Sequence, residues 1–244
     1  MIDSSGSVGE QNYHTVMEFC KSITNHRNVF LSEKDGVRIQ ASQFSSHVIE
    51  ILPFSSNRTE IMNALDQSSS LGYNTQIFDS LRYISDETIP FTRKNSKRIL
   101  IFVTDGKSDP PDDIIDIIQE AERLKSQEEV VIFTVGIGEH YLKEEVSGIA
   151  SGTGTGKNKY MFHVNNFEAL DNITGELAQE VCSPHYWLIG IPLAIIIAFY
   201  ILIWFLDYRE LKALKRDTND LSEGTRTNFT SGFIKKIVAD TEAN

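Results

Sequence analysis

Hydrophobic and polar residues follow two different periods along the first 182 positions. Two short apolar runs, residues 37–44 and 48–54, are separated by three polar residues, which predicts a β-hairpin. Later runs beginning at Ile99, Val130 and Lys159 are continuously apolar, as is typical of parallel strands buried on both faces. Helices are predicted over residues 58–67, 75–85, 112–125, 141–150 and 167–181. This alternation predicts a doubly wound, Rossmann-like α/β fold: a mostly parallel sheet with one antiparallel edge strand and helices on both faces.

The first and last helices have the clearest apolar faces. In each, four apolar residues recur at positions i, i+3, i+4 and i+7, so that they lie on one side of the helix. These residues are Val16, Phe19, Cys20 and Ile23 in the first helix, and Leu170, Ile173, Leu177 and Val181 in the last. Cys20 is therefore expected to be a small core residue without a reactive role.

A longer apolar run, residues 186–206, has 21 residues and no charged side chain. A helix of that length spans the roughly 30 Å hydrocarbon layer of a membrane. Four basic residues follow the run, whereas residues 166–185 before it contain no Lys or Arg, so the C-terminus is expected to be cytoplasmic. We expect a single-pass plasma-membrane protein with residues 1–182 as an extracellular domain, 183–185 as a short linker, 186–206 in the lipid bilayer, and 207–244 as a largely disordered tail.

Two sequons are compatible with an extracellular domain, one at Asn57 and one at Asn172, and both are glycosylation candidates. A third, at Asn228, should stay unmodified in the cytosol. An exported domain also needs a signal peptide, and none follows Met1. Two explanations stay open: this is a piece of a longer precursor, which we favour, or the domain faces the cytosol and the span is an unusual anchor.

Composition narrows the choice of partners. A formal net charge of −11 argues against nucleic acid, because phosphate binding needs clustered positive charge. The Gly-rich residues 152–157 resemble a phosphate-binding loop, but Ser151 and Asn158 stand where such a loop needs Gly and Ser or Thr, so no nucleotide is expected. Two cysteines are too few for a disulfide framework, and Cys182 is expected to pair with a cysteine preceding Met1.

Oxygen-bearing side chains occur in three loops that the predicted sheet should bring together. Asp3, Ser5 and Ser7 lead from a strand end into a helix, Thr75 starts a helix, and Asp105 ends a strand. In open α/β sheets such loops meet at the carboxyl ends of the strands. Carboxylate and hydroxyl oxygens suit one divalent cation, Mg²⁺ first, with Mn²⁺ or Ca²⁺ as alternatives. Asp and Ser are also common helix N-caps, so the first loop alone could be a capped helix start without metal.

This pattern resembles the metal-ion-dependent adhesion site (MIDAS) of von Willebrand factor type A (VWA) and integrin inserted domains. Segments 44–46, 132–138 and 162–170 resemble the same family. The resemblance implies that residues 1–182 bind an extracellular protein ligand, which offers an acidic side chain to the metal, without catalysis. The family's first strand is mostly missing here, since only Met1 and Ile2 precede Asp3, and we expect the chain alone to be unstable.

Two alternatives to adhesion stay open. A phosphoryl-accepting Asp3 would need a second Asp two residues later, where Ser5 stands, and the six histidines form no catalytic motif, so a metal-dependent hydrolase is the weaker alternative. A membrane-anchored scaffold facing the cytosol is another. The last helix, close to the span, either reports ligand binding to it or is a simple stalk.

Overall fold

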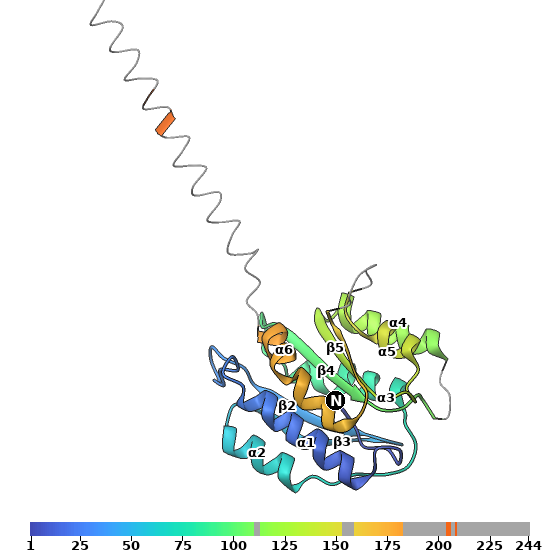
Figure 1. The fold of residues 1–244 in the computed structure, drawn as a ribbon. Coiled ribbons are helices and arrows are strands. Elements are labelled where there is room, and N and C mark those ends of the chain that lie inside the picture. Colours follow the sequence, from blue (N-terminus) through green and yellow to red (C-terminus); the bar gives the residue numbers. More distant parts are fainter. Residues whose placement is uncertain (110–112, 153–158, 183–203, 206–207, 209–244) are drawn as a thin grey trace, which may run out of the picture. The chain divides into compact units, whose positions relative to one another are not determined.

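The computed structural model describes residues 1–109, 113–152, 159–182, 204–205 and 208. A six-stranded sheet forms the centre of residues Met1–Ser183, with the strand order β3-β2-β1-β4-β5-β6 (Figure 1). All neighbouring strands are parallel except β3, which is antiparallel to β2 at the sheet edge. The strands are β1 (Ile2–Asp3), β2 (Ile39–Phe44), β3 (Val48–Ser55), β4 (Arg98–Thr104), β5 (Val130–Ile137) and β6 (Met161–Val164). The predicted α/β sheet, including its antiparallel edge, is confirmed.

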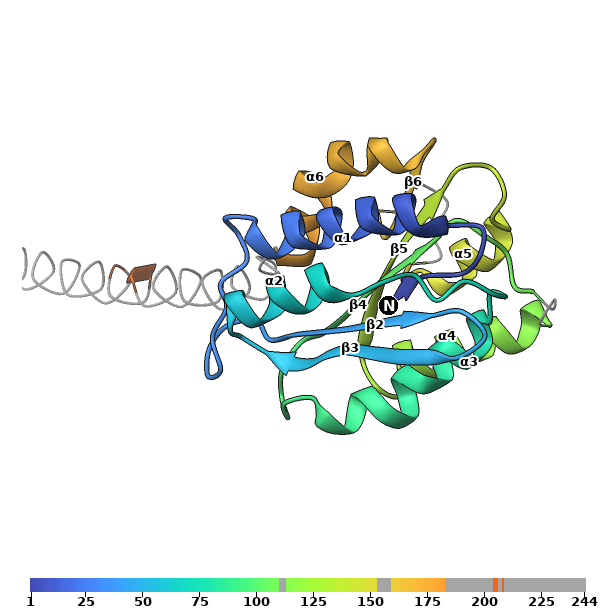
Figure 2. The same ribbon diagram turned by 90° about the horizontal axis from the view of Figure 1, so that it is seen from below.

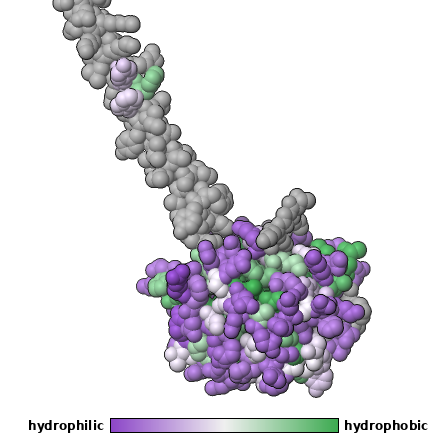
Figure 3. All heavy atoms as spheres, in the orientation of Figure 1, coloured by the Kyte–Doolittle hydropathy of each residue, from purple (hydrophilic) through white to green (hydrophobic). Residues whose placement is uncertain are grey.

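Helices cover both faces of the sheet (Figure 2). One face packs against α1 (Gly9–Asn25), α2 (Arg58–Gln67) and α6 (Leu170–Cys182), the last preceded by the 3-10 turn Phe167–Ala169. The other packs against α3 (Ile77–Tyr83), α4 (Ile114–Ser126) and α5 (Lys143–Ile149), with a π turn Ile84–Thr88 and a 3-10 turn Ile89–Phe91 after α3. Each face thus has its own hydrophobic core, and the outer surface seen in Figure 3 is mainly hydrophilic.

Helices α3, α4 and α5 each begin two residues later than predicted, and local contacts give the reason for α3 and α4. Residue Thr75 forms an isolated bridge with Asp109, whose backbone N–H donates to the Thr75 carbonyl at 2.8 Å, so α3 starts only at Ile77. Before α4, the Asp113 side chain accepts a hydrogen bond from the N–H of Ile115 and acts as the N-cap. Capping and bridging contacts of this kind decide helix ends to within a residue or two.

Cys20 lies where its helical spacing predicted. It is half-buried and packs against the core cluster that contains Val16 and Phe19. Burial raises the pKa of its thiol to about 11, because the charged thiolate is poorly solvated there. A thiol with so high a pKa is a weak nucleophile near neutral pH, which fits a structural role.

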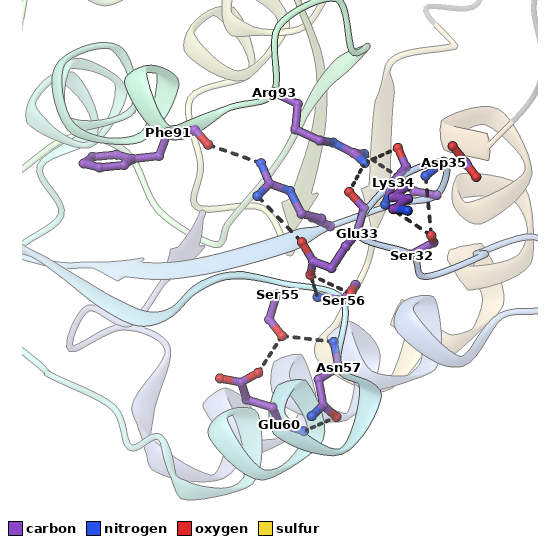
Figure 4. A network of polar contacts seen from close by, with 12 residues as sticks. Ser32, Glu33, Lys34, Asp35, Ser55, Ser56, Asn57, Glu60, Phe91 and Arg93 are labelled. Atoms are coloured by element: carbon purple, nitrogen blue, oxygen red, sulfur yellow. Dashed lines mark hydrogen bonds and ion pairs between the residues drawn. The ribbon is translucent and has the colours of Figure 1, made fainter.

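A polar network fixes the loops at the amino-terminal ends of β2 and β4, at the opposite end of these strands from the predicted metal loops (Figure 4). The Arg93 guanidinium donates to the backbone carbonyls of Glu33 and Lys34, at 2.9 Å each, and to that of Gly36. The Glu33 carboxylate in turn accepts hydrogen bonds from the N–H and hydroxyl of Ser56. Three segments distant in the sequence are thereby held together.

Strand β1 is much shorter than its neighbours. Its two residues pair with the ends of β2 and β4, and the Met1 amino group donates to the Ile101 carbonyl at 2.9 Å. A cavity of about 740 Å³ adjoins β1, lined in part by residues 39–41 of β2 and 98–101 of β4. The sheet therefore contains the short first strand that the sequence predicts.

The predicted span and linker lie almost wholly outside the described residues. Of residues 186–206, only Trp204 and Phe205 are described, and the linker 183–185 and most of the tail are not. Residues Pro184–Asn244 form a unit separate from the α/β domain. Among the described residues, none of the helices has the length and apolar character needed to cross a bilayer. The membrane span therefore stays a prediction.

Candidate metal centre

Three loops meet at the carboxyl ends of β1 and β4. The loop after β1 is tied to the segment before α3 by two backbone hydrogen bonds, from Gly6 N–H to the Tyr73 carbonyl at 2.8 Å and from Gly72 N–H to the Ser4 carbonyl at 2.9 Å. The bridge between Thr75 and Asp109 joins that segment to the loop after β4. The predicted ligands are thus carried by loops that are bonded to one another, at the edge of the sheet that the topology predicts.

Side-chain oxygens form a continuous chain across two of these loops. The hydroxyls of Ser5 and Ser7 lie 3.1 Å apart, and the Ser7 hydroxyl donates to Oδ1 of Asp105 at 2.8 Å. Ser7 and Asp105 are 98 residues apart in the sequence, so the sheet topology brings them together. Three of the five predicted site residues therefore lie in direct contact.

Thr75 reaches the same place through the space beside Gly106. A Cβ atom added at Gly106 would lie 3.6 Å from the Ser7 Oγ and 3.6 Å from the Thr75 Oγ1. The two hydroxyls therefore flank one small space, which the missing side chain of Gly106 leaves open. Thr75 itself is 5% exposed, so its hydroxyl faces this space rather than bulk water.

Asp3 is buried next to this chain of hydroxyls, and both of its carboxylate oxygens accept hydrogen bonds. Its Oδ1 accepts from the N–H of Ser5 at 2.9 Å, and its Oδ2 accepts from the Thr104 hydroxyl at 2.6 Å. Thr104 is a site residue that the sequence reasoning missed, although it stands in the Thr-Asp-Gly segment that contains Asp105. Its hydroxyl also accepts from the N–H of Gly106, so it links Asp3 to the loop after β4.

Both carboxylates are buried, with Asp3 2% and Asp105 8% exposed. Burial raises the pKa of Asp3 to about 6, and the nearby charge of Asp105 adds to this, against the lowering effect of the hydrogen bonds from Ser5 and Thr104. Burial also raises the pKa of Asp105, while the hydrogen bond from Ser7 lowers it. In the described part of the chain, no Lys or Arg forms an ion pair with either residue. A divalent cation between them would supply the missing positive charge.

The donor set fits a hard cation rather than a soft one. Across the residues that the structure describes, no three His, Cys, Asp or Glu side chains group in a way that could hold a metal ion. The candidate set has only two carboxylates, and its other members are the hydroxyls of Ser5, Ser7 and Thr75. Such an all-oxygen set is of the type that Mg²⁺, Mn²⁺ and Ca²⁺ prefer.

The raised pKa of Asp3 predicts an unusual dependence of stability on pH when no cation is added. The folded-state pKa of Asp3, about 6, exceeds the ordinary value of 3.8. The contribution of protonated Asp3 to folding stability is therefore fully present below pH 3.8 and is lost as the pH rises through 6. We expect the metal-free chain to lose about 1 kcal/mol of unfolding free energy from this group between pH 5 and 7.5. Urea unfolding at both pH values measures this, and Asp3→Asn should remove the difference; an identical pH profile in that variant would contradict the assignment.

The remaining candidate residues lie away from this centre. Asn57 is exposed and caps α2, since its side-chain oxygen accepts from the N–H of Thr59 at 3.1 Å and from that of Glu60 at 3.4 Å; the contact with Glu60 is drawn in Figure 4. Asn172 is exposed on α6. Cys182, at the end of α6, is half-buried and free; its predicted partner is a cysteine preceding Met1, so this disulfide stays a prediction. The 153–158 part of the Gly-rich segment lies outside the described residues.

The family model of the von Willebrand factor type A domain matches residues 1–176. This chain belongs to the VWA family. The human collagen alpha-6(VI) chain is 31% identical over 192 residues, covering 75% of this chain and 8% of the collagen chain. Its mouse counterpart is 27% identical over 242 residues, covering 97% of this chain and 9% of that one. The VWA chain thus spans less than a tenth of these relatives.

Solved structures give the same fold. Proximal thread matrix protein 1 from the mussel byssus, in a form with a zinc-occupied MIDAS motif, superimposes with a TM-score of 0.64 at 26% identity, covering 74% of this chain and 44% of that protein. The manganese-loaded TRAP protein of Plasmodium vivax gives a TM-score of 0.57 at 21% identity, covering 70% and 69%. At that lower identity the similarity concerns the fold alone.

Proposed function

We propose that this VWA domain binds an extracellular protein ligand through one divalent cation. The observation that carries the proposal is the chain of oxygens from Ser5 through Ser7 to Asp105, which joins two separate loops and includes one of the two buried carboxylates. The VWA domains of collagen relatives and the metal-occupied MIDAS of the mussel protein support it. The residues proposed to hold the cation are Asp3, Ser5, Ser7, Thr75 and Asp105.

Each proposed ligand has a distinct part. The hydroxyls of Ser5, Ser7 and Thr75 would bind the cation without neutralising it, and Asp105 would supply the carboxylate nearest to Ser7. Asp3, held by the Thr104 hydroxyl and the Ser5 N–H, would contribute a second negative charge. The bound cation supplies a Lewis-acidic position for an acidic side chain of the partner. Because few of its ligands are anionic, the cation would keep much of its attraction for that carboxylate.

Binding without catalysis is the proposed activity, with Mg²⁺ as the first choice of cation and Mn²⁺ or Ca²⁺ as alternatives. The two relatives described above are collagen chains, and the mussel protein is a thread matrix protein, which supports an adhesive or matrix-binding role. In the described region, neither Ser5 nor Ser7 has a hydrogen bond to a histidine, as a serine nucleophile would need.

Calorimetric titration tests the cation directly. The full chain in detergent micelles is titrated with MgCl₂, MnCl₂ and CaCl₂ after treatment with EDTA. We expect the chain to bind at least one of these cations saturably, with one ion per chain. Absence of uptake of all three by folded protein would overturn the proposal.

The membrane anchor is proposed on the sequence alone. Residues 186–206 would cross the bilayer, with residues 207–244 in the cytosol and the VWA domain outside. The 21 uncharged residues and the basic residues that follow them support this orientation. A membrane-anchored scaffold that faces the cytosol is the alternative, and glycosylation distinguishes the two.

Glycosylation should occur on the VWA domain and not on the tail. Asn57 and Asn172 are both exposed, and the amide nitrogen of Asn57 stays available because its capping contacts use the side-chain oxygen. We expect the protein, expressed in animal cells from its native coding sequence without an added leader, to shift in mass on treatment with an N-glycosidase. The double variant Asn57→Gln with Asn172→Gln should not shift, whereas Asn228→Gln should behave like the parent. If Asn228 alone were modified, the tail would have to lie outside the cell, and the proposed orientation would be wrong.

A further inference from the structure

Tyr73 combines exposure with a backbone conformation that bulky residues rarely adopt. Its side chain is 76% exposed, and its φ of 68° places it in the left-handed region, directly after Gly72 at φ 73°. Among the described residues, the only other non-glycine positions with positive φ are Asn95 and Glu129. A strained, exposed aromatic residue persists only where its surroundings hold it, and such positions are frequent at binding sites.

Hydrogen bonds on both sides hold the Tyr73 backbone in place. Its carbonyl accepts from the Gly6 N–H at 2.8 Å, and the N–H of Gly72 donates to the Ser4 carbonyl at 2.9 Å. On the other side, the N–H of Asn74 donates to the Ser46 hydroxyl at 3.3 Å. The approach to Gly6 is close, since a Cβ added there would lie 3.3 Å from the Tyr73 oxygen. The backbone position from which the ring projects is therefore held by contacts with the neighbouring loops.

These contacts place Tyr73 beside the proposed cation ligands. The Tyr73 carbonyl accepts a hydrogen bond from the N–H of Gly6, which stands between Ser5 and Ser7 in the sequence. Thr75 follows Tyr73 by two residues. Ser7 is also exposed, so the two loops present a common surface. A partner whose carboxylate reached the cation would lay its neighbouring residues across this surface.

We propose that Tyr73 determines partner specificity by stacking on an aromatic side chain adjacent to the partner's acidic residue. This inference rests on the proposed cation-dependent function. A tyrosine ring offers a large, rigid contact area at a low entropic cost, and a fixed backbone lowers that cost further. Phe30 and Phe91 are exposed to similar extents, 68% and 70%, but lack positive φ and lie in loops at the opposite end of β2 and β4.

Two capped peptides separate the ring contact from the carboxylate contact. Gly-Gly-Glu-Gly-Gly offers only the acidic side chain, whereas Gly-Gly-Glu-Phe-Gly adds one aromatic ring. Binding to the full chain in micelles with saturating Mg²⁺ is measured by ligand-observed NMR. We expect the Phe peptide to bind about two- to tenfold more tightly, as an aromatic pair provides. Tyr73→Ala should abolish this gain and leave the Gly peptide unchanged, while Tyr73→Phe and Phe91→Ala should retain it.

The outcomes distinguish this inference from the function on which it rests. Persistence of the gain in Tyr73→Ala, with Mg²⁺ uptake intact, overturns the role of Tyr73 alone. A gain at least as large for Gly-Gly-Glu-Arg-Gly overturns the choice of an aromatic neighbour in favour of a cation over the ring. If neither peptide binds the parent chain although Mg²⁺ does, the proposed ligand-binding function fails, and the inference fails with it.

Discussion

Asp105→Ala is expected to abolish cation-dependent ligand binding while leaving the fold intact. The substitution removes the acceptor of the Ser7 hydroxyl and one of the two buried carboxylates. Loss of a residue that merely orients a metal ligand typically costs about 10- to 100-fold in metal affinity, so loss of a ligand should cost about 100-fold or more. Calorimetric titration with Mg²⁺ measures this loss, and binding of the Gly-Gly-Glu-Gly-Gly peptide with and without EDTA measures its consequence.

Stability provides a second readout that separates a binding defect from misfolding. Burial raises the pKa of Asp105, so the ionised group is unfavourable without a cation. The metal-free variant should therefore be at least as stable as the parent, whereas added Mg²⁺ should stabilise only the parent. Asp109→Ala is the matched control, because it removes an exposed carboxylate from the same loop. Equal loss of Mg²⁺ affinity in both variants would contradict a specific role for Asp105.

The arrangement of strands and helices could be predicted because it follows from patterns that are local in the sequence. Continuous apolar runs such as the one that became β5 identify strands buried on both faces, and the bounds of α2 are those that the pattern predicts. The start of α3 could not be predicted in the same way. It depends on the bridge between Thr75 and Asp109, which forms only after two distant loops have met.

The same distinction between local patterns and distant contacts applies to the residues of the candidate site. Asp3, Ser5, Ser7, Thr75 and Asp105 could be selected because each stands at a strand or helix end and carries an oxygen. Thr104 was missed, because a hydroxyl at the end of an apolar strand gives no sign that it will bond to a carboxylate 101 residues away. Tyr73 was also missed as a contact residue, since neither its exposure nor its left-handed backbone has a periodic signal. The cation, the membrane span and the glycosylation sites stay predictions.

Phe102→Ala should destabilise the domain more than any surface change considered above. Phe102 is fully buried in β4. The centroid of its ring lies 5.2 Å from the ring centroid of Phe44 on β2. Both rings belong to the core that also contains Met1 and packs against α3. Removing a buried ring loses its apolar burial and leaves a cavity, which together cost about 3–5 kcal/mol of unfolding free energy.

The size of that cost relative to the total makes the test decisive. Domains of this kind have about 5–15 kcal/mol of stability, so the variant should be largely unfolded in moderate urea where the parent is folded. Urea unfolding followed by circular dichroism measures the difference. Phe91→Ala, which removes a 70% exposed ring, should change stability by no more than about 0.5 kcal/mol. Similar losses in the two variants would mean that the core between β2 and β4 is not packed as described.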